Sequence, residues 1–203
     1  MEDWVNRALE RWPNVPALYG WLALDRRGRW LIRGEVITRP QIIDTINRNY
    51  AGDEHGRWYF QNGPQRGYLR LEVAPYILRV GADGQSLETH TGLRIERPTQ
   101  ALLDEEGSLL VVSEHGPGQL ADHELDWALA RLRAGEAALD DASLADALAR
   151  PSDTHCGLRL QLGAHTLDVR RLDRERIPGT LGYTLDPQPR EGEHAVVGGD
   201  DAL

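Results

Sequence analysis

Short apolar runs separated by turn residues recur along this chain. The run Leu18–Leu24 is followed, after a glycine-containing turn, by Trp30–Ile32. Farther on, Arg57–Gln61 and Tyr68–Val73 alternate apolar and polar residues, and the Asn62-Gly63 dipeptide between them is typical of hairpin turns. Because successive side chains of a strand point to opposite faces, each pair of runs predicts a β-hairpin.

Four short segments show the helical spacing of apolar residues, and they predict helices near 2–12, 41–50, 122–133 and 143–149. Thr38 is the expected N-cap of the second helix, with Gln41 completing a capping box. The buried face of that helix is expected to hold Ile42, Ile43, Ile46 and Tyr50. Further strands are predicted over 76–80, 86–90, 101–103, 109–113, 158–162, 167–172 and 180–185. The expected fold class is α+β: β-rich antiparallel hairpins with three to four short helices.

One segment repeats. Leu22–Glu35 aligns without gaps on Ala101–Glu114, and the turn Asp and Gly coincide in the two copies. A fixed offset of this kind indicates a duplication, while two unrelated hairpins with the same turn are the alternative. We therefore expect two small similar subdomains, at 1–97 and 98–186. The remainder, 187–203, is Pro/Gly-rich and acidic, and is expected to be a disordered tail.

The net charge of the chain restricts the kinds of molecule that it is expected to bind. The formal net charge is −9, with 14 Arg against 12 acidic residues in 1–100 and 9 Arg against 20 in 101–203. An acidic chain is a poor match for nucleic acid or anionic membranes, so a nucleic-acid partner is not expected. The start of the chain lacks a signal-peptide pattern and no apolar run reaches about 18 residues, so we expect a cytoplasmic protein with no membrane partner.

No catalytic motif, cofactor fingerprint or metal-ligand spacing stands out, so the catalytic residues are unknown and no cofactor or metal is expected. The densest polar and aromatic cluster is the hairpin Arg57–Tyr68. Its side chains, with those at the end of the preceding helix, would line a polar pocket or a stacking surface. The candidate ligand- or partner-binding residues are Arg48, Asn49, Arg57, Tyr59, Gln61, Asn62 and Arg66. The alternative is that the aromatics form core and the arginines are solvated.

The function expected from these patterns is a non-enzymatic binding or protein-interaction module. Its partner would be an unknown small molecule or protein, with a homodimer as a further option. The alternative is a small-molecule enzyme whose polar active site is assembled from dispersed residues such as Arg48, His55, Tyr59 and Glu114. A deep pocket with convergent polar groups would favour the enzyme.

A resemblance supports the fold. The stretches GRWLIRGEVITRPQII, from Gly28, and DEHGRWYFQNGPQRGYLRLEVAPYILRV, from Asp53, resemble a bacterial family of uncharacterised proteins, domain of unknown function twelve-eighty-five, or a sister group of it. The matching positions are Gly28, Trp30, Gly34, Ile37, Arg39, Pro40, Gly56, Trp58, Tyr59, Ala74, Pro75 and Tyr76. The resemblance covers residues 25–92 and implies a β-rich α+β protein of two small subdomains. It carries no catalytic residue over to this chain.

Overall fold

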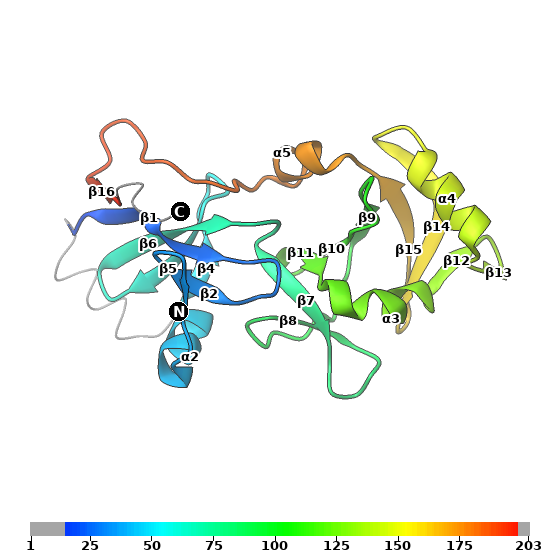
Figure 1. Ribbon diagram of the computed structural model, residues 1–203, viewed down its shortest axis with the longest axis horizontal. Coiled ribbons are helices and arrows are strands. Elements are labelled where there is room, and N and C mark those ends of the chain that lie inside the picture. The colour runs from blue at the N-terminus through cyan, green and yellow to red at the C-terminus, as the bar shows by residue number, and fades with distance from the viewer. Residues whose placement is uncertain (1–14, 199–203) are drawn as a thin grey trace. The chain divides into compact units, whose positions relative to one another are not determined.

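The computed structural model describes residues 15–198, and the chain divides into two compact units. The first unit is Met1–Pro75 with Gly182–Leu203, and the second is Tyr76–Leu181. Each unit is built around one β-sheet (Figure 1). The predicted fold class is confirmed: the protein is β-rich α+β, with two similar subdomains and four short α-helices among the described residues.

The sheet of the first unit has the strand order β3-β2-β1-β6-β5-β4, and β16 pairs with β1 beside this path. Its strands are β1 (Ala17–Leu24), β2 (Trp30–Ile32), β3 (Glu35–Val36), β4 (Tyr50–Gly52), β5 (Trp58–Asn62), β6 (Gln65–Leu71) and β16 (Ala195–Val197). Neighbouring strands form antiparallel hairpins, except that β1 runs parallel to both β6 and β16. Helix α2 (Pro40–Arg48) connects β3 to β4.

The sheet of the second unit has nine strands, in the order β13-β12-β14-β15-β9-β10-β11-β7-β8. They are β7 (Tyr76–Val80), β8 (Leu87–Thr89), β9 (Gln100–Leu103), β10 (Leu109–Ser113), β11 (Gly116–Leu120), β12 (Leu132–Ala134), β13 (Ala137–Ala138), β14 (Thr154–Leu162) and β15 (His165–Arg171). Helices α3 (Leu125–Leu129), α4 (Asp141–Ala149) and α5 (Ile177–Leu181) complete the unit, with 3₁₀ turns at Asp122–Glu124 and Arg174–Arg176. Helix α4 is capped by Asp140, whose side chain accepts the Ser143 N–H.

The two sheets share a topology. The order β3-β2-β1-β6-β5-β4 corresponds strand for strand to β11-β10-β9-β15-β14-β12, and both sheets are joined at the centre by a parallel pair. An equivalent backbone hydrogen bond closes each central pair, from Glu72 to Leu24 and from Leu172 to Leu103. The hairpins that align in the sequence therefore occupy equivalent places in the two units.

Three tight turns of sequence Asp-x-x-Gly connect neighbouring strands, at Asp25–Gly28, Asp53–Gly56 and Asp104–Gly107. In each turn one carboxylate oxygen accepts backbone N–H groups two and four residues later, at 2.7–3.0 Å. This is the Asx-turn geometry that makes aspartate common at such positions. The second oxygen binds an arginine. In the first two turns this arginine directly follows the glycine, and in the third it is Arg174.

The domain boundaries predicted at 97 and 186 differ from the observed division. The hairpin β7–β8 pairs with β11, so residues from Tyr76 onward belong to the second sheet. From Gly182 the chain returns to the first unit, where Leu71 donates its N–H to the Leu185 carbonyl and β16 pairs with β1. The described part of the predicted disordered tail, 187–198, therefore contains a paired strand. Hairpin patterns are local and do not indicate which sheet a hairpin joins.

Three local predictions are wrong. Helix α2 begins at Pro40, its N-cap is Arg39 rather than Thr38, and no side chain caps it. Proline is common at the first helical position, because its missing N–H would have no partner there. Ile42 is 42% exposed rather than buried. Residues 180–185 form the end of α5 and an irregular segment instead of a strand. The helix predicted over 2–12 lies outside the described residues.

Candidate functional site

The most connected polar group of the first unit is the guanidinium of Arg57, which follows the turn Asp53–Gly56 at the start of β5. Its side chain is only 10% exposed. Nε binds the Asp53 carboxylate at 2.8 Å, and Nη1 binds the Glu193 carboxylate at 2.8 Å. The Tyr19 hydroxyl accepts from Nη1 at 2.9 Å, and the Tyr68 hydroxyl accepts from Nη2 at 3.0 Å. One buried cation therefore joins the turn, two strands and the returning chain.

Aromatic rings surround this cation. Tyr19 and Tyr68 are stacked with ring centroids 4.6 Å apart, and Tyr59 meets Tyr68 edge-on at 5.7 Å. The guanidinium of Arg57 lies 4.4 Å from the centre of the Tyr68 ring, and that of Arg66 lies 4.4 Å from the centre of the Tyr59 ring. Arginine over a ring face is attracted by the ring quadrupole, more strongly where water is excluded. The rings thus fix the direction of both guanidinium groups.

The site holds its carboxylates in the ionised form. Burial raises the pKa of the Asp53 carboxyl, but backbone and side-chain hydrogen bonds from Arg57 outweigh burial and hold that pKa below its ordinary value. Burial likewise opposes ionisation of Glu193, yet its hydrogen bonds with the Arg190 N–H and Arg57 hold the pKa of Glu193 below its ordinary value. For Tyr19, burial raises the pKa far above the usual range, so its hydroxyl stays protonated.

We expect stability to fall in acid because of this network. The folded-state pKa of Asp53 is depressed, so its contribution is complete above the unfolded-state value of about 4 and is lost as pH falls through the lower folded-state value. Chemical unfolding measured between pH 6 and pH 2 should show that the free energy of unfolding falls less in Asp53→Asn than in wild type. Replacement of Asp44, an exposed acid on α2, by Asn is the control. The free energy of unfolding of this variant should change with pH as it does in wild type.

The carboxylate that reaches Arg57 belongs to Glu193, two residues before β16, the strand added to β1. Ala195, Val196 and Val197 pair in parallel with Ala17, Leu18 and Tyr19 (Figure 1, where β16 is red and β1 dark blue). On one side of β1, Leu18 pairs with Gly67 of β6. On the other side, β2 pairs only with Leu22–Leu24, and β16 pairs with the part of that edge that β2 does not cover. The pairing is closed by hydrogen bonds from Ala17 N–H to the His194 carbonyl and from Gly198 N–H to the Tyr19 carbonyl, at 2.9 and 2.8 Å.

The edge of β1 has a shape that accepts this segment. Gly20 has a positive φ of 73°, a conformation that favours glycine, and the register of β1 against β6 shifts at this point. A β-carbon on Gly198 would lie 2.8 Å from Nε1 of Trp21, so the last residue of the added segment must be small. Ala195 packs against the cluster of Ala17, Tyr19, Tyr59 and Tyr68. The site therefore combines a strand edge that is paired with β16, a buried cation and two positions for small residues.

A family model described as "Protein of unknown function (DUF2946)", designated DUF2944, matches residues 1–188. The chain belongs to this family. The prediction of an uncharacterised family, DUF1285 (domain of unknown function twelve-eighty-five) or a sister group, is thereby confirmed at the level of a family of unknown function. No curated protein sequence matches the chain.

Two solved structures are similar to this DUF2946-family chain. One is a DUF1285 family protein from Silicibacter pomeroyi DSS-3, with 16% identity and a TM-score of 0.49 over 81% of this chain and 86% of that one. The other is a DUF1285 family protein from Shewanella baltica OS155, with 14% identity and a TM-score of 0.40 over 55% of this chain and 88% of that one.

The structure of this DUF2946-family protein gathers some of the predicted site residues and separates others. Arg57, Tyr59 and Arg66 belong to one cluster, and Gln61 joins it by accepting from Nε of Arg66 at 3.2 Å. Asn49 is buried at the end of α2, where its side chain donates to the Thr45 carbonyl. Two further predicted residues, Arg48 and Asn62, are exposed.

Two of the predicted site residues on β5, Tyr59 and Gln61, are buried, Gln61 completely. The side-chain amide of Gln61 donates to the Gly63 carbonyl inside the hairpin turn, at 2.9 Å. A strand in the interior of a sheet can be covered on both faces, and alternation of residue types does not reveal the second cover.

Four essential members of the site were missed by sequence reasoning: Tyr19, Asp53, Tyr68 and Glu193. Asp53 carried a usable signal, because the sequence Asp-x-x-Gly-Arg occurs at both 25–29 and 53–57, with arginine bound to the turn carboxylate in each. Glu193 lies 136 residues from Arg57, and no sequence signal linked the two residues.

Other site types find little support in the described residues. Within 15–198, no group of three or more His, Cys, Asp or Glu side chains is arranged to hold a metal ion. No helix in that range is long and apolar enough to cross a membrane. The lone Cys156 is buried, and burial raises the pKa of its thiol. The cavities within the described part of the chain include two of about 360 Å³, one beside the Asp25 turn and one in the second unit.

Proposed function

We propose that this protein is a non-enzymatic binding module that receives an extended protein segment as an added strand along β1, with a carboxylate of that segment bound to Arg57. The observation that carries the proposal is the chain's own segment 193–198, which already occupies this site in that manner. Strand addition is a recurring mode of peptide recognition, in which backbone hydrogen bonds give affinity and side-chain pockets give specificity.

The resident segment is suited to exchange. It pairs over only three residues, and its two valines, Val196 and Val197, are 44% and 56% exposed. A short strand with little buried apolar surface gains little from the hydrophobic effect, so its attachment rests on backbone hydrogen bonds and on Glu193. Arg57 keeps its bond to Asp53 when Glu193 leaves, which allows the site to persist without the tail.

The contacts of the resident segment define the expected ligand. An acidic residue binds Arg57, a small residue follows two positions later at the Tyr19 cluster, and glycine stands three positions beyond it beside Trp21. The pattern is Glu-x-Ala-x-x-Gly. We infer that the partner is an acidic, extended protein segment of this form, which includes the same segment from a second copy of the chain.

The enzyme alternative has no specific observation in its favour. Glu114, one of its dispersed candidates, accepts the backbone N–H groups of Glu96 and Arg97 and thus supports a loop. Tyr59 is covered by Tyr68 and Arg66. Both groups are engaged in roles that stabilise the fold.

The proposal is tested with the full chain and a labelled peptide of residues 189–198, followed by fluorescence anisotropy. We expect the Glu193→Ala variant to bind the peptide at least about tenfold more tightly than wild type, because the resident carboxylate no longer competes for Arg57. The same peptide with glutamine in place of its Glu193 should lose most of this affinity.

Glu191→Ala provides the matched control, since Glu191 is an exposed acid two residues away in the same segment. It should leave peptide affinity at the wild-type value. Equal binding of the glutamate and glutamine peptides, or no binding to Glu193→Ala, would show that the segment is a fixed part of the fold and the proposal is wrong.

A further inference from the structure

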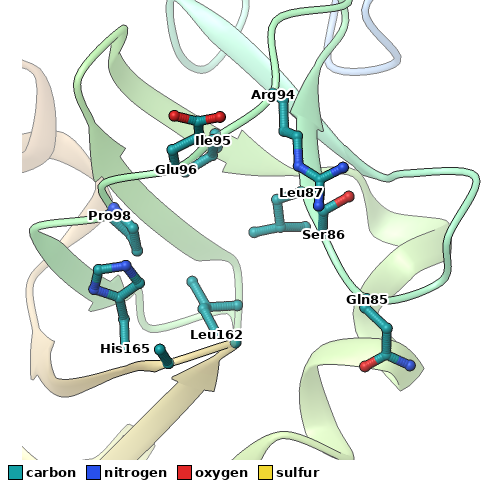
Figure 2. Close-up of a pocket in the computed structure, with 11 residues that line it drawn as sticks. Gln85, Ser86, Leu87, Arg94, Ile95, Glu96, Pro98, Leu162 and His165 are labelled. Carbon is teal, nitrogen blue, oxygen red and sulfur yellow. The ribbon is translucent and has the colours of Figure 1, made fainter.

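The second unit contains a cavity of about 360 Å³ that is independent of the β1 site. Three segments form it: the turn entering β8, the loop that follows β8, and the turn between β14 and β15 (Figure 2). Its lining residues include Gln85, Ser86, Arg94, Glu96, Pro98 and His165. A cavity of this size is within the range of small-molecule sites.

The floor of the cavity is apolar. Leu87 and Leu162 are 4% and 8% exposed, and Figure 2 shows both side chains pointing toward the space between the three segments. Ile95, Pro98 and Ala164 add further apolar surface. Such a floor favours the apolar body of a ligand, while the charged groups around it determine the orientation of that ligand.

One wall is fixed by Asp83. Its Oδ1 accepts the N–H groups of Gln85 and Ser86 and the Ser86 hydroxyl, each at 2.8 Å, and its Oδ2 binds Nη2 of Arg94 at 3.1 Å. Trp127 and Arg131 bind the same turn, because both donate hydrogen bonds to the Gly84 carbonyl. The guanidinium of Arg94, whose side chain is 58% exposed, lies beside Ser86, as Figure 2 shows.

The loop after β8 is fixed from outside the cavity. Glu114 accepts the backbone N–H of Glu96 at 2.8 Å and that of Arg97 at 3.1 Å, and Nε2 of His115 bonds the Arg94 carbonyl at 2.9 Å. These bonds hold the backbone and leave the side chain of Glu96 available. Within residues 15–198, neither the Glu96 carboxylate nor the His165 imidazole has a hydrogen bond or an ion pair.

The charges of the lining are of both signs. Arg94 brings a cation whose partner Asp83 uses one side of the guanidinium, and Glu96, two residues later, brings an anion that forms no ion pair with it. A ligand with only a carboxylate would be repelled by the carboxylate of Glu96, and a ligand with only an ammonium group would be repelled by the guanidinium of Arg94. Electrostatic complementarity therefore favours a ligand with both charges.

We infer that this cavity binds a small zwitterion with an apolar body, such as an apolar amino acid or dipeptide. Its carboxylate binds Arg94, its ammonium binds Glu96, and its apolar side chain covers Leu87 and Leu162. The backbone of the turn and of the loop is held by hydrogen bonds, which reduces the entropy lost when a ligand binds.

Isothermal titration calorimetry of the full-length protein with L-leucine and with L-leucyl-L-leucine tests the inference. We expect a dissociation constant below about 1 mM for at least one of the two probes. Leucinol, which lacks the carboxylate, and 4-methylpentanoate, which lacks the ammonium group, should bind at least tenfold more weakly than leucine if leucine is the ligand. Leucyl-leucinol and N-acetyl-leucyl-leucine serve in the same way for the dipeptide.

Arg94→Ala and Glu96→Ala should each weaken binding of the zwitterion at least tenfold. Arg97→Ala is the matched control, because Arg97 is an exposed neighbour that does not line the cavity, and it should bind as wild type does. Absence of binding of both probes at 10 mM, or binding that is indifferent to removal of either charge, would overturn the inference. The β1 peptide site is measured separately and its result does not depend on this one.

Discussion

Replacement of Arg57 by alanine is expected to lower the free energy of unfolding by about 3–5 kcal/mol, the cost of removing one partner from a buried ion pair. The side chain of Asp53 is only 2% exposed, so its carboxylate would remain buried without its cation. The hydroxyls of Tyr19 and Tyr68 would lose the donor that they share. Denaturant unfolding followed by tryptophan fluorescence measures the effect.

Arg29→Ala is the matched control for this experiment. Arg29 follows the turn Asp25–Gly28 as Arg57 follows Asp53–Gly56, and its Nε binds Asp25 at 2.7 Å. Its side chain is 48% exposed, however, so the ion pair is solvated and its removal should cost about 1 kcal/mol or less. Similar losses for the two variants would contradict the assignment of Arg57 to a buried network.

Replacement of Gly56 by alanine is expected to destabilise the first unit by about 3 kcal/mol or more. Gly56 has a positive φ of 74°, which costs a residue with a side chain about 1–2 kcal/mol. In addition, a β-carbon at this position would lie well inside van der Waals contact with the Gly182 carbonyl oxygen, a backbone atom that cannot rotate away. The returning segment would be displaced, and the hydrogen bond from Thr184 N–H to the Gly56 carbonyl would be lost.

Gly107→Ala separates the two contributions. Gly107 is the corresponding glycine of the turn Asp104–Gly107, with a positive φ of 87°, and nothing lies within 4 Å of its added β-carbon. Its replacement should cost only the conformational part, about 1–2 kcal/mol. Unfolding measurements should be accompanied by hydrogen exchange of the Thr184 amide, which should accelerate in Gly56→Ala alone. Equal effects of the two substitutions would show that residues 182–184 do not pack on the Gly56 turn.

The three Asp-x-x-Gly turns show how far local sequence determines this fold. Asp accepts the backbone N–H groups of its own turn and glycine takes the left-handed conformation, so both interactions lie within five residues and are readable from the chain. The hairpins they connect, including β1–β2 and β9–β10, were therefore predicted correctly. The third turn shows the limit: Ser108 stands where arginine follows the other two, and Arg174, 70 residues away, binds Asp104 instead.

The sequence by itself determined the hairpins, most of the helices and the β-rich α+β class, because these depend on alternation, turn residues and spacing over a few positions. Only the tertiary structure decided which hairpins share a sheet, since the parallel pairs β1–β6 and β9–β15 join strands that are distant in the chain. The same holds for the site. Arg57 was a candidate from its neighbours, but its burial, its stacked tyrosines and its bond to Glu193 arise from contacts across 38 and 136 residues, for which no local pattern exists.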